Sequence, residues 1–283
     1  MRARAPASSA NLGPGYDTLA LALSLHVEVE VSEAPRLVVR TEGEGSDLPA
    51  DESHLAARVA VRVAGHDRLS IVVRSQVPVG RGLGSAASLA AAAAAAAGAP
   101  DPLAVAAEVD GHPENAAASV VGGLVAAATV DGRPVVVPLP LDAGLAFVVL
   151  VPDRQLATNT ARSALPDRVD HADAAFNLGR MGLLLGGLAD ARRLLAAATE
   201  DRLHQSQRAP LFPEAEELMR RLVEVGALAS CWSGAGPSIL GICRRSDAAR
   251  VHDAAPGILE AVGVAGVGHL LDADHAGLVV DGR

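Results

Sequence analysis

The 283-residue sequence contains no lysine, and all 24 of its basic residues are arginine. This absence excludes Schiff-base chemistry and a pyridoxal-phosphate anchor, because both need a lysine amine. It also excludes a Walker A loop, in which lysine precedes the serine or threonine. Any phosphate group must therefore be held by backbone amides, arginine or a metal ion.

Disulfide spacing, long apolar runs and a positive net charge are missing too. The only two cysteines, Cys231 and Cys243, show no framework spacing, which predicts reduced thiols in a cytoplasmic protein. The apolar stretch 19–25 and the alanine tract 90–97 are shorter than the roughly 20 residues of a membrane span, so we expect no membrane segment or export signal. The 33 acidic against 24 basic residues disfavour nucleic acid and favour a small-molecule substrate.

The apolar pattern along the chain predicts a mixed protein of helices and strands in two domains. Residues 26–31 alternate with period two and predict a strand, and the apolar runs 69–73 and 145–151 predict more buried strands. Asp131-Gly132 predicts a hairpin between strands near 123–130 and 135–139. A strand, glycine turn and strand are expected over 227–242. We expect helices up to residue 97 and over 102–109, 172–198, 213–225 and 247–262, with domains 1–143 and 144–283.

The most informative segment has three glycines in five positions just before the alanine tract. It reads Pro78-Val79-Gly80-Arg81-Gly82-Leu83-Gly84-Ser85-Ala86-Ala87-Ser88. Glycine adopts backbone angles closed to other residues, Ser85 lies where a helix would begin, and a helix N-terminus attracts anions. The segment predicts a phosphate site, although a tight strand-to-helix turn explains it equally well on its own. A dinucleotide fingerprint is excluded, because only Leu83 separates Gly82 from Gly84.

Two polar segments could supply further site residues. In the turn-rich segment 6–17, the Asn11 amide and the Asp17 carboxylate could face a cavity, or could simply form turns. The segment Glu108-Val109-Asp110-Gly111-His112-Pro113-Glu114-Asn115 ends one helix and starts another. Its carboxylates suit Mg²⁺, which takes one or two protein ligands and completes its shell with water and phosphate. Solvated or helix-capping carboxylates are the alternative.

Two arginines and a second glycine turn follow. Thr158-Asn159-Thr160-Ala161-Arg162 and His204-Gln205-Ser206-Gln207-Arg208 each place an arginine beside polar neighbours. Arginine grips a carboxylate through two parallel hydrogen bonds, but either residue could be an ordinary surface charge. Segment 233–238, Ser-Gly-Ala-Gly-Pro-Ser, lies between apolar strands and fits a hairpin as well as a site.

Three of these segments, taken in order, resemble the three motifs of the GHMP kinases. They are Pro-X-X-X-Ala-Asn-Leu-Gly-X-Gly-(aromatic)-Asp at 6–17, Pro-X-Gly-X-Gly-Leu-Gly-Ser-X-Ala at 78–87 and Ser-Gly-X-Gly-Pro-Ser at 233–238. Within this family the chain is most similar to the homoserine kinases, on residues 11–17, 111–115 and 158–162. The resemblance covers the chain from Pro6 to about Ile242.

The resemblance implies an α+β fold with an N-terminal ribosomal-protein-S5-like domain and a C-terminal ferredoxin-like domain, with the site between them. It implies ATP and Mg²⁺ as cofactors, L-homoserine as substrate and, as an expectation from the family alone, a homodimer. The loop 78–88 would bind ATP, with His54 on the adenine side, and Glu108 and Ser85 would hold the metal. The matching homoserine-binding positions are Asn11, Asp17, His112, Asn115, Thr158, Arg162 and Arg208.

The resemblance also bears on mechanism. A loose phosphoryl-transfer transition state needs positioning and charge stabilisation, which the loop, Ser85, Asn115 and the Glu108-bound metal would provide. An amide at Asn115 cannot accept a proton, which favours direct transfer from the homoserine hydroxyl, its proton lost to phosphate or solvent. Asp110 or Glu114 as general base is the alternative.

The sequence departs from the family pattern at three positions. Ala86 replaces a serine of the loop, His54 replaces an asparagine, and Glu114 replaces an aspartate. Two other functions stay open: a GHMP kinase for another small alcohol, and a catalytically impaired nucleotide-binding homologue. Asp17, which can pair an ammonium, and two arginines, which can clamp a carboxylate, favour an amino-acid substrate.

Overall fold

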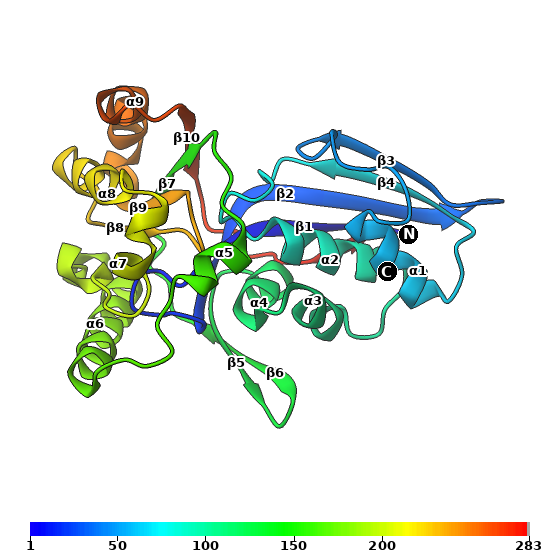
Figure 1. Ribbon diagram of the computed structural model, residues 1–283, viewed down its shortest axis with the longest axis horizontal. Coiled ribbons are helices and arrows are strands. Elements are labelled where there is room, and N and C mark those ends of the chain that lie inside the picture. The colour runs from blue at the N-terminus through cyan, green and yellow to red at the C-terminus, as the bar shows by residue number, and fades with distance from the viewer. Residues whose placement is uncertain (282–283) are drawn as a thin grey trace.

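The computed structural model describes residues 1–281, which form two β-sheets with helices packed against them (Figure 1). The first sheet has seven strands in the order β11-β1-β2-β4-β3, and the β5–β6 hairpin extends from β2. Only the β3–β4 pair is parallel among these strands. The strands are β1 (Arg2–Ala10), β2 (Leu19–Glu33), β3 (Val38–Gly43), β4 (Leu69–Ser75), β5 (Leu124–Val130), β6 (Arg133–Leu139) and β11 (Val279–Asp281).

The first two strands are longer than their sequence pattern suggests. The expected strand 26–31 is the second half of β2, and the apolar stretch 19–25 belongs to its first half. The first residues of the polar segment 6–17, from Pro6 to Ala10, form the end of β1. The pairing of β1 with β2 shifts register between Pro6 and Ala7. Its small serine and alanine side chains are buried against helices and loops, so they give no alternating pattern. The turn expected there is confined to residues after Ala10.

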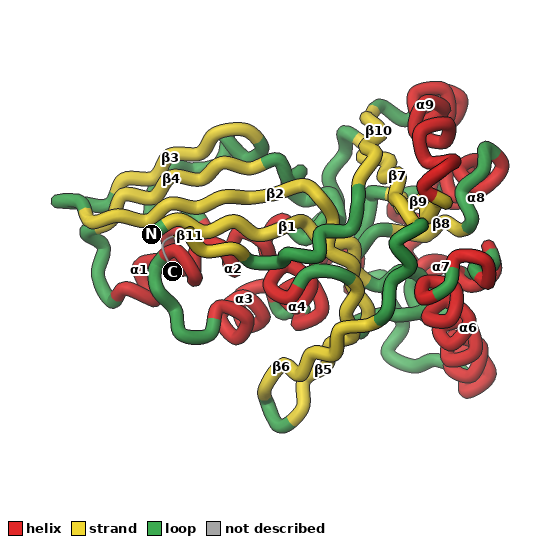
Figure 2. Tube along the Cα trace, turned by 180° about the vertical axis from the view of Figure 1, so that it is seen from behind, coloured by secondary structure: helices red, strands yellow, loops and turns green. Residues whose placement is uncertain are grey.

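Four helices cover one face of this sheet (Figure 2). The alanine tract forms α2, whose residues Ala90–Ala94 are completely buried. Alanine has the highest helix propensity and lets neighbouring backbones approach closely on every side, which suits a helix enclosed by β1, β2 and three other helices. The predicted helix start at Ser85 is confirmed. The helices are α1 (Leu55–Ala64), α2 (Ser85–Ala96), α3 (Pro102–Asp110) and α4 (Pro113–Val121).

The second sheet has the order β10-β7-β9-β8, and its strands β7, β8 and β9 are buried on both faces. In β7, Ala146, Val148 and Leu150 pack against α8 and α9, whereas the alternate residues Phe147 and Val149 join the core shared with α6 and the first sheet. Burial on both faces explains the continuous apolar run that predicted this strand. Its elements are β7 (Leu145–Pro152), β8 (Ala229–Trp232), β9 (Ile239–Arg244), β10 (Gly266–Leu271), α5 (Thr158–Ser163), α6 (His171–Ala189), α7 (Gln205–Arg208), α8 (Ala215–Glu224) and α9 (Arg245–Val262).

Two expectations change in the second half of the chain. The helix expected over 172–198 ends at Ala189, because Asp190 turns the backbone and caps a short 3₁₀ turn instead. Strands β7 to β10 form the second sheet and lie in the expected domain 144–283. Strand β11 follows them in the chain but pairs with β1 in the first sheet, so the two sheets do not divide exactly between the expected domains 1–143 and 144–283. Over residues 1–281, the helices are too short or too polar to cross a membrane.

Candidate active site

Three segments far apart in the sequence meet between the two sheets. Ser233, in the turn between β8 and β9, donates from Oγ to the carbonyl oxygen of Gly82 at 2.7 Å and shares a 2.9 Å hydrogen bond with Ser9 Oγ. The Gly234 amide donates to the carbonyl oxygen of Ala10 at 3.0 Å. The second glycine turn therefore fastens the phosphate-type loop to the end of β1.

The glycines of the loop 78–88 allow close packing and also leave the loop backbone open to a ligand in the pocket. Gly80, Gly82 and Gly84 all have positive φ, between 63° and 75°. A methyl group would overlap the carbonyl oxygen of Ser233 at Gly82 and the hydroxyl of Ser8 at Gly84, so packing alone requires two of the glycines. All three also line a pocket, where Gly84 is the N-cap of α2 and provides no capping side chain. The amides of the first turn of α2 are thus available to an anion.

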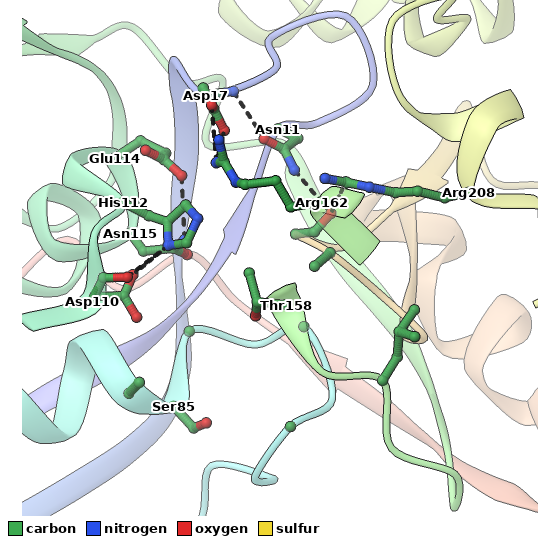
Figure 3. A pocket seen from close by; sticks show the side chains of 17 residues that line it. Asn11, Asp17, Ser85, Asp110, His112, Glu114, Asn115, Thr158, Arg162 and Arg208 are labelled. Atoms are coloured by element: carbon green, nitrogen blue, oxygen red, sulfur yellow. Dashed lines mark hydrogen bonds and ion pairs between the residues drawn. The ribbon is translucent and has the colours of Figure 1, made fainter. Parts of the chain in front are cut away.

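At the opposite end of this pocket, Asp17 and Arg162 form an ion pair. Arg162, in the last turn of α5, donates from Nη2 to both carboxylate oxygens of Asp17, at 2.9 and 3.0 Å (Figure 3). Asn11 accepts from the Asp17 amide at 3.0 Å and donates to the carbonyl oxygen of Gly234 at 2.9 Å. Asn11 and Asp17 both have positive φ, a strained conformation that asparagine and aspartate tolerate better than most other residues with a side chain.

Arg208 reaches the same end from α7 and is only 2% exposed. Its Nε donates to the carbonyl oxygen of Ala161 at 3.2 Å, and its Nη1 donates to Gly234 O and to His204 Nδ1. Its Nη2 makes no hydrogen bond within the described range 1–281, and Arg208 lines the pocket. Burial lowers the pKa of Arg208 from its ordinary value, and the nearby Tyr16 and Asp17 oppose this shift.

Two aromatic rings hold the arginines in place. Tyr16 has the guanidinium carbons of Arg162 and Arg208 at 5.9 and 5.5 Å from its ring centroid, and it stacks on His204 at 5.2 Å. Because His204 Nδ1 accepts from Arg208, its Nε2 carries the proton and donates to the carbonyl oxygen of Gly13 at 2.8 Å. Burial lowers the pKa of His204 to about 4, which keeps the ring neutral.

Asn115 joins the two ends of the pocket. Its Oδ1 accepts from Ser8 Oγ at 2.8 Å, and its Nδ2 donates to Glu114 Oε1 at 3.3 Å. A methyl group on Gly84 would lie 3.2 Å from Asn115 Oδ1, so this amide is close to the start of α2.

The structure brings most of the expected site residues into this one pocket. Those that line it are Asn11, Asp17, Gly80, Gly82, Gly84, Ser85, Ala86, His112, Asn115, Thr158, Arg162 and Arg208. Residues of the same loop that do not line it are Pro78, Val79, Arg81, Leu83, Ala87 and Ser88. Leu83 and Ala87 are buried, and the Ser88 hydroxyl donates to the backbone carbonyl of Ser85, so these side chains hold the loop rather than face a ligand.

The structure corrects the placement of Glu108. This carboxylate, 62% exposed, points away from the pocket and pairs with Arg62 of α1 at 2.5 Å. The hydrogen bond from Arg62 lowers the pKa of Glu108. Asp110, two residues later, lines the pocket instead.

His54 is corrected too. Its Nδ1 accepts from the amide of Ala56 at 3.2 Å and caps α1, while its Nε2 lies 3.3 Å from Thr41 Oγ1. The ring is 4% exposed and does not line the pocket. Both ring nitrogens are occupied within the protein, so His54 supports the fold rather than a nucleoside.

The donor set of the pocket fits a magnesium ion. Asp110 Oδ2 is buried and makes no hydrogen bond within residues 1–281, but it lies 3.4 Å from His112 Nδ1, an ion-pair contact. Asp110 lies on the same side of the pocket as Ser85 (Figure 3). In the part of the chain that the structure describes, no three acidic, histidine or cysteine side chains form a metal cluster. Asp110 and Ser85 would offer the one or two protein oxygens that Mg²⁺ takes, with water and phosphate at its other positions.

Some residues in and around the pocket have no role that the sequence predicts. Ser8 and His204 are buried partners of site residues, and nothing in their sequence context distinguishes them from core polar residues. Tyr16 is the aromatic residue of the first motif, and the sequence predicts no further role for it. Glu114, Leu156, Gly234 and Ala235, with Asp110, complete the lining.

Comparison with known proteins agrees with this architecture. The N-terminal domain model of the GHMP kinases matches residues 53–123, and the C-terminal model matches residues 181–259. Homoserine kinase of Leifsonia xyli subsp. xyli is 42% identical over 262 residues, which cover 85% of this chain and 80% of that protein. Homoserine kinase of Streptomyces avermitilis is 41% identical, covering 89% and 88%.

A solved structure supports the same assignment. The crystal structure of homoserine kinase from Cytophaga hutchinsonii superposes with a TM-score of 0.81 at 25% identity, covering 99% of this chain and 96% of that one. The expected α+β GHMP kinase architecture is therefore confirmed. The chain belongs to the homoserine kinase family of the GHMP kinases.

Proposed function

We propose that this protein transfers the γ-phosphoryl group of ATP to the side-chain hydroxyl of L-homoserine, which gives O-phospho-L-homoserine and ADP for threonine biosynthesis. One observation carries the substrate class: Asp17, Arg162 and Arg208 converge at one end of the pocket, opposite the glycine loop. An α-amino acid offers an ammonium for Asp17 and a carboxylate for the two arginines. Mevalonate or a sugar has no ammonium to pair with Asp17.

The glycine loop supports the role of ATP. Backbone amides at the start of α2, with its helix dipole, favour the phosphate groups without any lysine. Bound Mg²⁺ would neutralise phosphate charge, and Asp110 and Ser85 are the residues that would hold it. Magnesium, a cytoplasmic location and a homodimer belong to this proposal.

The chain's own residues position the reactants for direct transfer. We call Asp17, Arg162 and Arg208 the clamp. Asn115 lies between the clamp and the start of α2, where its amide can orient the homoserine hydroxyl toward the γ-phosphate of ATP. The homoserine oxygen forms a new bond to the γ-phosphorus, and the bond from phosphorus to the β–γ bridging oxygen breaks, leaving its electron pair on ADP. The hydroxyl proton is lost to phosphate or solvent. No covalent phosphoenzyme is needed.

A panel of small alcohols tests the proposal. ADP release in the presence of Mg-ATP should depend on homoserine and should be at least 100-fold slower at equal concentrations of mevalonate or galactose. Turnover with one of the other alcohols would favour a different GHMP kinase. No turnover with any alcohol would favour an impaired nucleotide-binding homologue.

A further inference from the structure

A buried carboxylate, Asp201, lies behind the clamp and has no role in the function described above. Its side chain is fully buried just before α7, the helix that carries Arg208. Its Oδ1 accepts from Asn177 Nδ2 of α6 at 2.6 Å. The backbone amides of residues 203–205 donate to its two oxygens at 2.7 to 3.0 Å. Four neutral N–H groups therefore hold this carboxylate.

Asp201 is negatively charged at neutral pH. Burial alone would raise its pKa, but the adjacent His204 and the hydrogen bonds to the carboxylate lower it. A charge in the protein interior destabilises the folded state unless hydrogen bonds or an opposite charge compensate it. The hydrogen bonds of Asp201 supply the first kind of compensation, and Arg208 is placed to supply the second.

Arg208 is the buried positive charge on the other side of His204. Its three hydrogen bonds go to neutral acceptors, which are the carbonyl oxygens of Ala161 and Gly234 and Nδ1 of His204. His204 Nδ1 accepts from Arg208 at 3.1 Å, while its Nε2 lies 3.7 Å from Asp201 Oδ2. Burial lowers the pKa of Arg208, and Asp201 is one of the negative groups that oppose this shift. One imidazole ring thus separates a buried anion from a buried cation.

This separation matters for binding, because within residues 1–281 no carboxylate is bonded to Arg208. A directly bonded aspartate would occupy the guanidinium, as Asp17 occupies Arg162. At the distance of one ring, Asp201 favours the charge of Arg208 without taking up its N–H groups. Arg208 lines the pocket and points toward Asn11 (Figure 3). It can therefore bond the carboxylate of a ligand.

The same ring also sets the distance between the two ends of the clamp. His204 Nε2 donates to the carbonyl oxygen of Gly13 at 2.8 Å, in the turn that carries Asp17. The backbone amide of His204 is itself bonded to Asp201. A displaced Asp201 would therefore move His204, and with it both Arg208 and the turn that carries Asp17.

We propose that Asp201 is a positioning residue that acts through His204 to hold Arg208 charged and oriented for the carboxylate of the substrate. This inference rests on the proposed function, because homoserine supplies that carboxylate. Asp201 does not line the pocket, so it acts on the substrate only through other residues. Its loss should weaken the binding of an amine that carries a carboxylate more than the binding of the same amine without one.

The test compares homoserine with 3-aminopropan-1-ol, which is homoserine without its carboxylate, in wild type and in Asp201→Asn. The second amine is measured as a substrate or as a competitive inhibitor of homoserine. D201N should raise the homoserine KM by about 10- to 100-fold, because a small misplacement of a binding group has a large effect. It should change the constant for 3-aminopropan-1-ol by less than about threefold.

Two further variants separate positioning from a general loss of structure. Asp190→Asn is the matched control, because Asp190 also accepts from a backbone amide at the start of a short turn but lies outside the pocket. It should change neither constant by more than about twofold. When D201N is added to Arg208→Ala, the preference for homoserine should fall no further, because residues that act together are not additive.

Other results overturn the inference. An equal loss for both amines in D201N, or an unchanged homoserine KM in the folded variant, would show that Asp201 does not act through Arg208. So would a full further loss of preference in the double variant. Thermal unfolding checks that D201N is folded. If it is not, His204→Ala decides: a loss confined to homoserine supports the inference, and an equal loss or no loss overturns it. Absence of homoserine-dependent turnover in wild type contradicts the proposed function instead.

Discussion

Arg162 and Asp17 contact each other across the pocket, with one guanidinium nitrogen donating to both carboxylate oxygens at 2.9 and 3.0 Å. They are also the two residues expected to bind opposite ends of an amino acid. A zwitterion can exchange with this pair without a net change in charge, because its ammonium takes the place of the guanidinium and its carboxylate takes the place of Asp17. A neutral alcohol offers no such exchange, so the pair favours an amino-acid substrate.

Replacing Arg162 tests this exchange. Arg162→Ala should raise the homoserine KM by about 10- to 100-fold, because charge-assisted hydrogen bonds contribute about 1.5–3 kcal/mol. ATP KM should change little, and steady-state ADP release measures both constants. Arg192→Ala is the matched control, since that side chain is 83% exposed and pairs with Asp190 outside the pocket. Equal homoserine KM in both variants would contradict the clamp.

Replacing Gly84 tests the phosphate loop. Gly84→Ala places a methyl group against Ser8 Oγ at a positive φ, so we expect a loss of about 1–3 kcal/mol in the free energy of unfolding and a raised ATP KM. Gly132→Ala is the control, because Gly132 also has a positive φ, of 75°, but open space around it in the β5–β6 hairpin. It should lower stability by about 1 kcal/mol and leave ATP KM unchanged. Urea unfolding and ADP release separate the two effects.

The two acids at the end of α3 should behave differently. Glu108→Gln should leave turnover within about twofold of wild type, because Glu108 forms only an exposed ion pair with Arg62. Asp110→Asn should raise the Mg²⁺ concentration needed for half-maximal ADP release by about tenfold or more. Binding of Mn²⁺ in the presence of ATP gives an independent readout. Loss of metal affinity in E108Q but not in D110N would show that Glu108, and not Asp110, binds the metal.

His54 should matter for stability and not for nucleotide binding. His54→Ala removes the side-chain cap of α1 and should lower the free energy of unfolding by about 1 kcal/mol, with ATP KM unchanged. His54→Asn keeps a good capping side chain and should recover most of that loss. Chemical denaturation and ATP titration measure the two quantities. A raised ATP KM at unchanged stability would favour a nucleoside contact.

Glu114 predicts a pH dependence of folding. Burial raises its pKa to about 7 in the folded protein, from near 4.5 in the unfolded chain, so the folded state binds the proton more tightly. The stability that this group contributes is present below about pH 4.5 and is lost as pH rises through about 7. Relative to wild type, E114Q should therefore gain up to about 3 kcal/mol between pH 4.5 and pH 8. Urea unfolding at several pH values measures it, and a constant difference would contradict the raised pKa.

The sequence predicted the local elements that depend on local physics. Glycines followed by alanines predicted the helix start at Ser85, and Asp131-Gly132 predicted the turn between β5 and β6. The run 145–151 predicted a buried strand. The first strand was harder to recognise, because its buried serines and alanines are small and show no alternation. The end of α6 was missed since the apolar pattern continues beyond Ala189.

The motifs determined the family and most residues of the pocket, because glycine, asparagine and arginine at fixed spacings carry the chemistry of the site. Only the tertiary structure decided which acids face it. Glu108 and Asp110 lie about 200° apart around α3, so the two side chains cannot both face the pocket. Asp110 lies one turn beyond the buried Ala106 and shares its face, whereas Glu108 reaches Arg62, which is 46 residues earlier in the chain. The same packing of α4 buries Glu114 beside Asn115 and sets its pKa, because both depend on contacts that no local spacing encodes.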